Sequence, residues 1–213
     1  AENILPLNEL GGLPTRNLQT ARFENASKIS GEVLAQEYLG RRLACSHCPI
    51  GCIHIAALRE PYGDEPYFYK TSMICYDYEP MYALGTMLGI SEPEGFLKLM
   101  DQVEKRGLDS MSTGVVLAWA TEALEKGIIT ETETKGIKLR WGDYNSYIEA
   151  VKSIVDKSDG FYNALARGVE YASSKYGGKD FALSFMGNEM PGYHTGPGAH
   201  VGVFIGARHS HLD

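Results

Sequence analysis

Apolar residues recur every three or four positions along most of the 213-residue chain, which is the spacing of helices with one buried face. Potential N-caps, prolines in first turns and terminal glycines divide this pattern into successive helices. It predicts helices over residues 30–41, 49–58, 80–89, 92–107, 110–127, 146–159 and 161–176. The expected fold is therefore all-α and multihelical, with two closely packed helical subdomains and little or no β structure.

The helix that follows Asp109 is expected to be central. Its residues from Val115 to Leu124 are apolar on nearly every side. A helix of this kind is normally buried, because it has no polar face to turn toward solvent.

Three stretches fall outside the helical pattern. Residues 67–76 are aromatic and β-branched, which predicts a short strand or extended segment. Residues 1–29 are rich in Asn, Gly, Pro and Thr and are expected to form an irregular segment that packs on a missing N-terminal domain. Residues 186–198 form a long Gly/Pro-rich loop around His194, and loops of that length in a compact domain are usually functional or disordered.

These boundaries divide the chain into the irregular segment 1–29, a helical domain over 30–127 that carries the cysteines, and a helical domain over 128–213. The last domain ends in the Gly/Pro-rich loop without a closing helix. We therefore expect it to be incomplete at its C-terminus and the chain to be a piece of a longer protein.

Composition and charge limit the classes of partner. Hydrophobic residues make up 44% of the chain, charged residues 22%, and the net charge is −7. Without a basic run, this charge argues against binding to nucleic acid or to an anionic membrane surface. No apolar stretch approaches the roughly 20 residues of a membrane span, and the N-terminus lacks a signal-peptide pattern. The expected location is cytoplasmic.

Three of the four cysteines lie within eight residues, at Cys45, Cys48 and Cys52. Thiolates at this C-x2-C-x3-C spacing can converge on one metal centre, and few, clustered cysteines fit a reducing compartment. A zinc site usually needs a second ligand pair, and a thioredoxin-like motif needs a βαβ unit. Radical enzymes that use S-adenosylmethionine have the two gaps in reverse order.

A cubane 4Fe-4S cluster with a fourth cysteine from elsewhere fits the spacing best, while zinc and unligated or redox-active thiols stay open. Cys75 is the only other cysteine. It is either that fourth ligand or a small apolar residue on an extended segment.

Seven short motifs follow one another along the chain. They are Leu13-Pro14-Thr15-Arg16-Asn17, Ala44 to Cys52, Tyr78-Glu79 with Ala83-Leu84-Gly85, Gly107 to Gly114, Glu125-Lys126-Gly127-Ile128, Leu139-Arg140-Trp141-Gly142 and Gly187 to Tyr193. In this order they resemble the tungsten-containing aldehyde:ferredoxin oxidoreductases, over essentially the whole chain. The resemblance implies an N-terminal β-rich domain that holds a bis-pterin tungsten or molybdenum cofactor, followed by two mostly helical domains. This chain is similar to the helical part.

The resemblance also implies a set of ligands. Cys45, Cys48 and Cys52 match three ligands of the family's 4Fe-4S cluster. The fourth belongs to a D-x-x-G-L-C segment expected after Asp213, which leaves Cys75 as a bystander.

The pterin-binding pattern D-x-x-G-L-D is matched from Glu104 through Leu108 to Asp109, with Glu104 in place of the leading aspartate. A carboxylate at residue 104 still accepts hydrogen bonds from pterin N–H groups. Asp109 is also expected to cap the central helix, and the two roles are compatible.

The resemblance makes two residues candidates for catalysis, one at a matching position and one where the sequence departs from the family pattern. Glu79 lies where the family has a glutamate near the metal, although a carboxylate at a helix start is also stabilised by the helix dipole. His194 is a candidate proton donor, in a loop where relatives have a Tyr-Asp-Pro-Arg type sequence.

The implied activity of the full-length protein is oxidation of an aldehyde to a carboxylic acid, with electrons passing through the cluster to ferredoxin. The isolated chain is expected to be inactive, because the fourth cluster ligand and most of the pterin site lie outside it. Two alternatives stay open: a ferredoxin-linked reductase of the same family with another substrate, and a cofactor-free helical interaction module.

Overall fold

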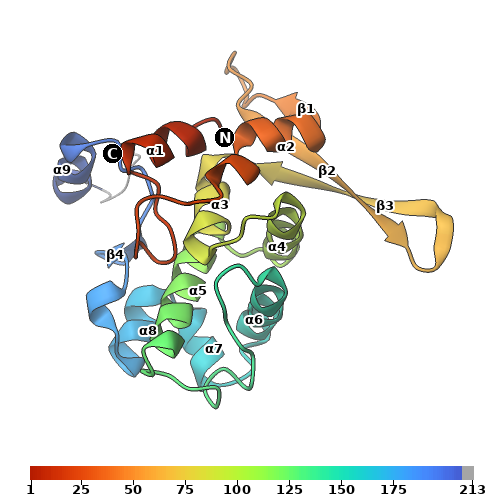
Figure 1. Ribbon diagram of the computed structural model, residues 1–213. Helices are drawn as coiled ribbons and strands as arrows, with labels where there is room; N and C mark the ends of the chain where they lie inside the picture. The colour runs from red at the N-terminus through yellow and green to blue at the C-terminus, as the bar shows by residue number, and fades with distance from the viewer. Residues whose placement is uncertain (208–213) are drawn as a thin grey trace.

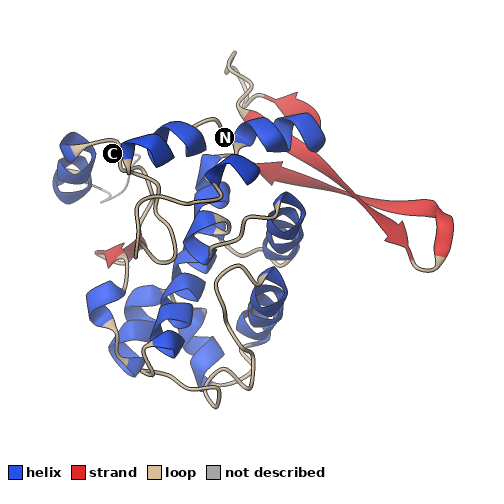
Figure 2. Cartoon of the chain, viewed as in Figure 1, coloured by secondary structure: helices blue, strands red, loops and turns tan. Residues whose placement is uncertain are grey.

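The computed structural model describes residues 1–207, apart from the side chain of Pro66. Its helices pack around one central helix, and a long β-hairpin extends from one side of this helical body (Figure 1). Most of the strand residues belong to this hairpin and the strand beside it (Figure 2).

Helices form most of the body. The α-helices of the described residues are α1 (Ile4–Leu10), α2 (Gly31–Glu37), α3 (Tyr78–Ala83), α4 (Pro93–Lys105), α5 (Ser110–Glu125), α6 (Tyr144–Asp156), α7 (Gly160–Leu165), α8 (Val169–Tyr176) and α9 (Pro197–Ile205). Short 3-10 helices lie at Ala26–Lys28, Thr86–Leu88 and Lys179–Phe181. None of the helices within residues 1–207 is long and apolar enough to cross a membrane.

The hydrophobic core draws side chains from both predicted helical segments, 30–127 and 128–213. The division of the chain at these boundaries stays a prediction.

Helix α5 is the central helix, as its sequence predicts. Its N-cap Asp109 accepts a hydrogen bond from the backbone N–H of Ser112 at 2.7 Å. Every residue from Val115 to Ala123 is buried, including the fully covered indole of Trp119. Helices α3, α4, α6 and α8 all contact it (Figure 1).

Helix α3 approaches α5 closely at Gly114. A Cβ atom at residue 114 would lie 2.2 Å from the carbonyl oxygen of Ala83 and 2.8 Å from the Ala83 Cβ. A side chain is also excluded at Gly85, just after the end of α3, because a Cβ atom there would lie 2.2 Å from the Met81 carbonyl oxygen. Glycine at these two positions allows backbone to pack directly against backbone.

The expectation of an all-α fold is wrong, because the structure is mixed α/β. Strands β1 (Leu39–Leu43), β2 (Ile53–Tyr62) and β3 (Glu65–Tyr76) form an antiparallel sheet in the order β1-β2-β3. A two-stranded sheet pairs β4 (Ser184–Phe185), just before the Gly/Pro-rich segment, with β5 (Asn188–Glu189) inside it. The extended segment predicted over residues 67–76 is confirmed as part of β3.

The helix predicted over residues 49–58 is the largest error. His54, Ala56 and Leu58 are buried in β2, and the residues between them are partly exposed, which is the period of a strand. A short apolar run fits both periods, so pairing with β3 decides between them. The helix predicted over residues 30–41 ends at Glu37 for the same reason, because residues 39–43 pair with β2.

Two other predicted helices are shorter in the structure. The helix predicted over residues 161–176 is divided into α7 and α8 at Gly168, which has a φ of +91°. The helix predicted over residues 80–89 begins earlier as α3, ends at Ala83 and continues only as a 3-10 turn.

Replacing Gly114 with alanine is expected to lower the free energy of unfolding by about 1–3 kcal/mol, because the added methyl group overlaps the Ala83 carbonyl. The matched control is Gly202→Ala in α9, where a Cβ atom has no neighbour within 4 Å. That variant should keep or slightly gain stability, since alanine favours helices. Urea denaturation measures both. Equal stabilities would show that α3 and α5 do not depend on this contact.

Candidate functional site

The N-terminus of α3, the loop before β2 and the segment after β5 meet around an open cavity of about 460 Å³. Its lining includes Cys52, His54, Asp77, Glu79 and Tyr193, together with Glu2, Arg42 and Tyr78. The cavity thus brings a thiol, an imidazole, carboxyl groups and phenols together from segments that are distant in the sequence.

The two carboxyl groups lie at the start of α3. Asp77 is the N-cap residue of this helix, and Glu79 belongs to its first turn. The phenol of Tyr193 donates a hydrogen bond to Oε1 of Glu79 at 2.6 Å. Burial, together with the neighbouring Glu79 carboxylate, raises the pKa of Asp77 to about 6. Burial and the same carboxylate raise the pKa of Tyr193 far above its usual range, so this phenol stays a donor at neutral pH.

The segment that carries Tyr193 is held on α3 by two more tyrosines. Tyr78 donates to the carbonyl oxygen of Gly192 at 2.6 Å, and Tyr82 donates to the carbonyl oxygen of Met190. Gly192 has a φ of +75°, and a Cβ atom there would lie 2.7 Å from the Tyr82 ring. These contacts fix the position from which Tyr193 reaches Glu79.

Two buried polar atoms of the lining lack a hydrogen-bond partner among the described residues. They are Nδ1 of His54 and Oδ1 of Asp77. Burial, followed by the charge of Arg42, lowers the pKa of His54. Because buried polar atoms are normally satisfied, these two atoms suit the cavity to a polar ligand or to water.

The three cysteines of the C-x2-C-x3-C motif lie in the loop between β1 and β2, not on the helix expected from Pro49. The backbone N–H of Cys48 donates to the carbonyl oxygen of Cys45 at 3.0 Å, which closes a turn between the first two. All three thiols are free, Cys45 and Cys52 are exposed, and Cys48 is half-buried. Within residues 1–207, no three His, Cys, Asp or Glu side chains are arranged as a metal site. Among the described residues, the loop therefore does not form a metal centre by itself.

Cys75 is separate from this loop. It lies in β3, where its backbone pairs with Ile55 of β2. Burial, with smaller contributions from Asp77 and Glu104, raises the pKa of its thiol to about 11. A metal ligand is a thiolate, so this environment suits a structural cysteine better than a ligand.

The residues matched to the pterin pattern are only partly brought together. Leu108 and Asp109 line a small cavity of about 150 Å³ at the N-terminus of α5, next to Ser112 and Gly168. Glu104 is not among the residues that line it. Burial raises the pKa of Glu104, whereas a hydrogen bond that its carboxylate accepts from the backbone of Cys75 acts in the opposite direction.

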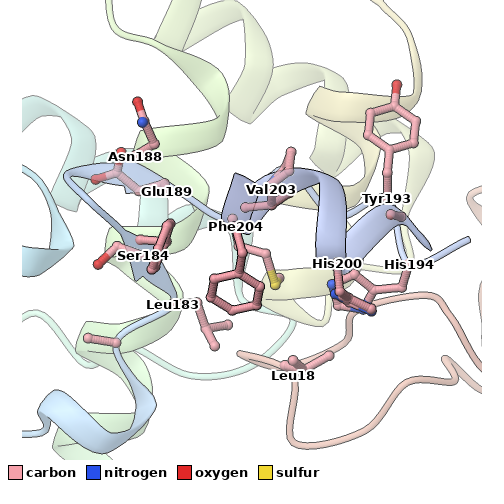
Figure 3. Close-up of a pocket in the computed structure, with 15 residues that line it drawn as sticks. Leu18, Leu183, Ser184, Asn188, Glu189, Tyr193, His194, His200, Val203 and Phe204 are labelled. Atoms are coloured by element: carbon pink, nitrogen blue, oxygen red, sulfur yellow. The ribbon is translucent and has the colours of Figure 1, made fainter. Parts of the chain in front are cut away.

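His194 faces a different cavity, of about 300 Å³ and mainly apolar, between the β4–β5 hairpin and α9 (Figure 3). Its ring centroid lies 5.0 Å from that of His200, and burial followed by the charge of His200 lowers its pKa. Tyr193 lines both cavities, but its phenol points away from His194 (Figure 3). The structure therefore places Glu79 and His194 in adjacent cavities rather than in one.

Sequence analysis assigned no role to Asp77 or Tyr193. Asp77 precedes Glu79 by two residues, and Tyr193 precedes His194 by one. Their proximity in sequence to candidate residues was the available signal, but the contact between Tyr193 and Glu79 joins residues that are 114 positions apart.

Comparisons with known proteins agree on one family. The family model described as "Aldehyde ferredoxin oxidoreductase, domains 2 & 3" matches residues 1–208. The tungsten-containing aldehyde ferredoxin oxidoreductase of Thermococcus kodakarensis is 36% identical over 191 residues, which are 88% of this chain and 29% of the relative. The aliphatic sulfonate oxidoreductase, WOR-like subunit, of Pyrococcus furiosus is 34% identical over 163 residues, which are 76% of this chain and 25% of the subunit.

Among solved structures, a chain of the active site complex BamBC of benzoyl coenzyme A reductase with 1,5-dienoyl-CoA has a similar fold. The TM-score is 0.61 and the sequence identity 23%, over 85% of this chain and 26% of that one. The chain thus spans less than a third of the length of each of these proteins.

Removing the hydroxyl of Tyr78 is expected to cost about 1–3 kcal/mol of stability, because the Gly192 carbonyl loses a buried donor. Tyr67→Phe is the matched control, since that side chain is 87% exposed, against 2% for Tyr78. Urea denaturation measures the cost, and limited proteolysis reports release of the segment over residues 186–196. If Tyr78→Phe behaves like Tyr67→Phe, the hydrogen bond does not hold this segment.

Proposed function

We propose that this chain, which belongs to the aldehyde ferredoxin oxidoreductase family, is the cluster-binding and proton-handling part of a tungsten-containing oxidoreductase. The proposed reaction of the full-length protein is oxidation of an aldehyde to a carboxylic acid, with ferredoxin as the electron acceptor. The observation that supports the proposal is the shared cavity, which is lined both by Cys52 of the cysteine motif and by the carboxylate of Glu79.

In this proposal Cys45, Cys48 and Cys52 hold a 4Fe-4S cluster with a fourth cysteine from outside the described residues. Three free thiols in one short loop, closed by the turn between Cys45 and Cys48, support it. The cluster supplies one-electron transfer when it is bound. Of these three cysteines, Cys52 lines the cavity that also contains Glu79. In this proposal the cluster therefore lies next to the group that accepts the proton.

The tungsten or molybdenum bis-pterin cofactor supplies the two-electron oxidation when bound, and an N-terminal domain of the same protein provides most of its site. We assign Leu108 and Asp109 to the pterin because they line a cavity at the start of α5. The Asp109 oxygen that caps the helix is engaged, which leaves its second carboxylate oxygen for a pterin N–H group. Glu104 is assigned a supporting contact on the evidence of its motif position alone.

Glu79 is the proposed proton acceptor. The hydrogen bond from Tyr193 fixes the orientation of its carboxylate, and the cavity gives the group access to a substrate. A positioned carboxylate can take the proton that is released when water adds to a carbonyl group. We assign to His194 a hydrogen bond to the substrate carbonyl, with the apolar cavity beside it holding the organic part of the substrate.

A second function within the family is oxidation or reduction of another substrate. The relative named as an aliphatic sulfonate oxidoreductase supports this alternative, because it is almost as similar as the aldehyde enzyme. A cofactor-free helical interaction module is the remaining alternative. Iron, sulfide and tungsten analysis of the full-length protein distinguishes it, since a module of this kind contains none of them.

Substitution of Cys48 by alanine in the full-length protein is expected to remove most of the cluster iron and sulfide, because the cluster loses a ligand. Tungsten content should stay close to that of the unaltered protein. The control is Cys75→Ala, which should keep both metals. Metal analysis of protein purified without air tests both variants. Loss of the cluster from Cys75→Ala, with retention in Cys48→Ala, would reverse the ligand assignment.

Replacing Glu79 with glutamine in the full-length protein is expected to lower turnover by about 10²–10⁴-fold, because the amide cannot accept the proton. Iron and tungsten contents should not change, since the side chain keeps its shape and its hydrogen bond from Tyr193. The same assay on Glu65→Gln, at the exposed start of β3, provides the control. Unchanged turnover of Glu79→Gln would remove this residue from the mechanism.

A further inference from the structure

The two faces of the sheet β1-β2-β3 have different surroundings. Along β2 and β3, buried residues alternate with half-buried or exposed ones, so one face packs on the helical body and the other is open. We call the open side the outer face. Strand pairing brings its apolar residues together: Leu43, Ile53, Ile55, Ala57, Tyr69 and Met73. The far end of the hairpin lies beyond the helices (Figure 1).

The outer face is unusually apolar for a surface in contact with water. The open face of an antiparallel sheet normally carries polar side chains. Here Tyr69 and Met73 are each 52% exposed, and Leu43 is 38% exposed. A contiguous apolar surface of this kind marks a place that another molecule covers. Tyrosine, methionine and arginine are also enriched where proteins meet.

The charges of the outer face have one sign. Within the regular pairing of the described strands, its charged residues are Arg41, opposite Ile55, and Arg59. The acidic Glu60 belongs to the other face, where its Oε1 lies 3.6 Å from Nζ of Lys98. The whole chain nevertheless has a net charge of −7. A cationic and apolar face on an acidic chain is complementary to an acidic partner.

Arg59 and Tyr69 form one unit near the far end of this face. The guanidinium carbon of Arg59 lies 4.8 Å from the centroid of the Tyr69 ring, which is a cation–π contact. Both side chains are exposed. They offer a partner a positive charge and an aromatic surface at the same spot.

A second copy of this chain suits the outer face poorly. A symmetric contact places the same patch of both copies together, so Arg41 and Arg59 of one copy would meet the same arginines of the other. Like charges brought together at an interface oppose association. The arginines therefore favour a different, acidic protein.

The near end of the outer face lies at the cysteine loop. Leu43 and Ile53 are the strand pair from which this loop extends. Cys45 and Cys52 are exposed, and Ile50 in the same loop is 77% exposed. Because electron transfer slows steeply with distance, a protein that receives electrons at this loop has to bind beside it.

We propose that the outer face and the cysteine loop form the docking surface for an acidic electron-carrier protein, with Arg59 and Tyr69 as its distal anchor. This inference rests on the proposed function, which supplies the electrons. Oxidation of one aldehyde with one water gives one carboxylic acid, two protons and two electrons. Two one-electron carriers are therefore reduced in turn for each aldehyde.

The direct test is binding of a bacterial-type, two-cluster ferredoxin of net negative charge to the full-length protein, measured by calorimetry without air at low salt. Arg59→Glu should weaken binding by about 10-fold, because the reversed charge repels an acidic partner. The control is Lys179→Glu, at an exposed residue shortly after α8, which lies far from the hairpin (Figure 1). It should bind within about twofold of wild type. Equal affinities of wild type and Arg59→Glu, or no binding of ferredoxin at all, overturn the proposal.

Footprinting requires no substitution, so it decides the question even if Arg59→Glu does not fold. Carbene labelling of Tyr69 and Met73 in the full-length protein should fall when ferredoxin is added, because the partner covers both side chains. Labelling of Leu10, which is 79% exposed in α1, should not change. Tyr69 and Met73 that are already protected without ferredoxin are covered by another domain or by a second copy, and either result overturns the proposal.

Kinetics separates this inference from the proposed function. With an aldehyde substrate, Arg59→Glu should lower kcat/KM for ferredoxin by about 10-fold. Reduction of benzyl viologen, a small acceptor that needs no protein interface, should stay within about twofold of wild type. Equal losses with both acceptors reject a docking role for Arg59. Ferredoxin binding that depends on Arg59, without aldehyde oxidation, leaves the docking surface standing and rejects the proposed reaction.

Discussion

The structure depends on the close backbone contact between α3 and α5 at Gly114. Helix α5 is buried through its middle turns, so its position is set by the core on all sides. At Gly114 the backbone of α5 lies directly against Ala83, the last residue of α3, with no side chain of residue 114 between them. The position of α5 therefore fixes that of α3. Helix α3 in turn presents Glu79 at one end and the hydroxyl groups of Tyr78 and Tyr82 along its length. A candidate catalytic carboxylate is thus placed by a contact between two backbones in the core.

The segment from Glu189 to Tyr193 is tied down at both ends, which explains how an irregular stretch can place a side chain accurately. At its start, Ser112 of α5 donates to Glu189 at 2.9 Å, and the backbone N–H of Val169 donates to the same carboxylate at 3.1 Å. The N-cap residue of α8 is Gly168, which has no side chain to cap the helix, so Glu189 satisfies one of its free N–H groups. At its end, the three tyrosine hydrogen bonds attach the segment to α3. Both attachments depend on the position of α5, because Ser112 belongs to α5 and α3 packs against it.

Sequence analysis predicted the parts that depend on local chemistry. The burial of α5 and its Asp109 cap follow from the residues within one helix, and both are confirmed. The strand from Ile53 was missed because its short apolar run fits two periods and Pro49 resembled a helix start. The clustered thiols and Glu79 were found through motifs. Asp77 and Tyr193 were not, because their significance arises only where distant segments meet.

The pairing of β2 with β3, which sequence analysis missed, joins the cysteine loop to the carboxyl groups. In an antiparallel pair, the start of one strand lies beside the end of the other, about 5 Å away. His54 near the start of β2 pairs with Tyr76 at the end of β3. Cys52 lies just before the start of β2, and Asp77 and Glu79 lie just after the end of β3. The cysteine and the two carboxyl groups are therefore at the same end of the paired strands. The helix expected over residues 49–58 has no such ladder, and nothing in it would have set the register between the cysteines and α3. The cysteine loop and the carboxyl groups are brought to one cavity by strand pairing, in a chain whose body is helical.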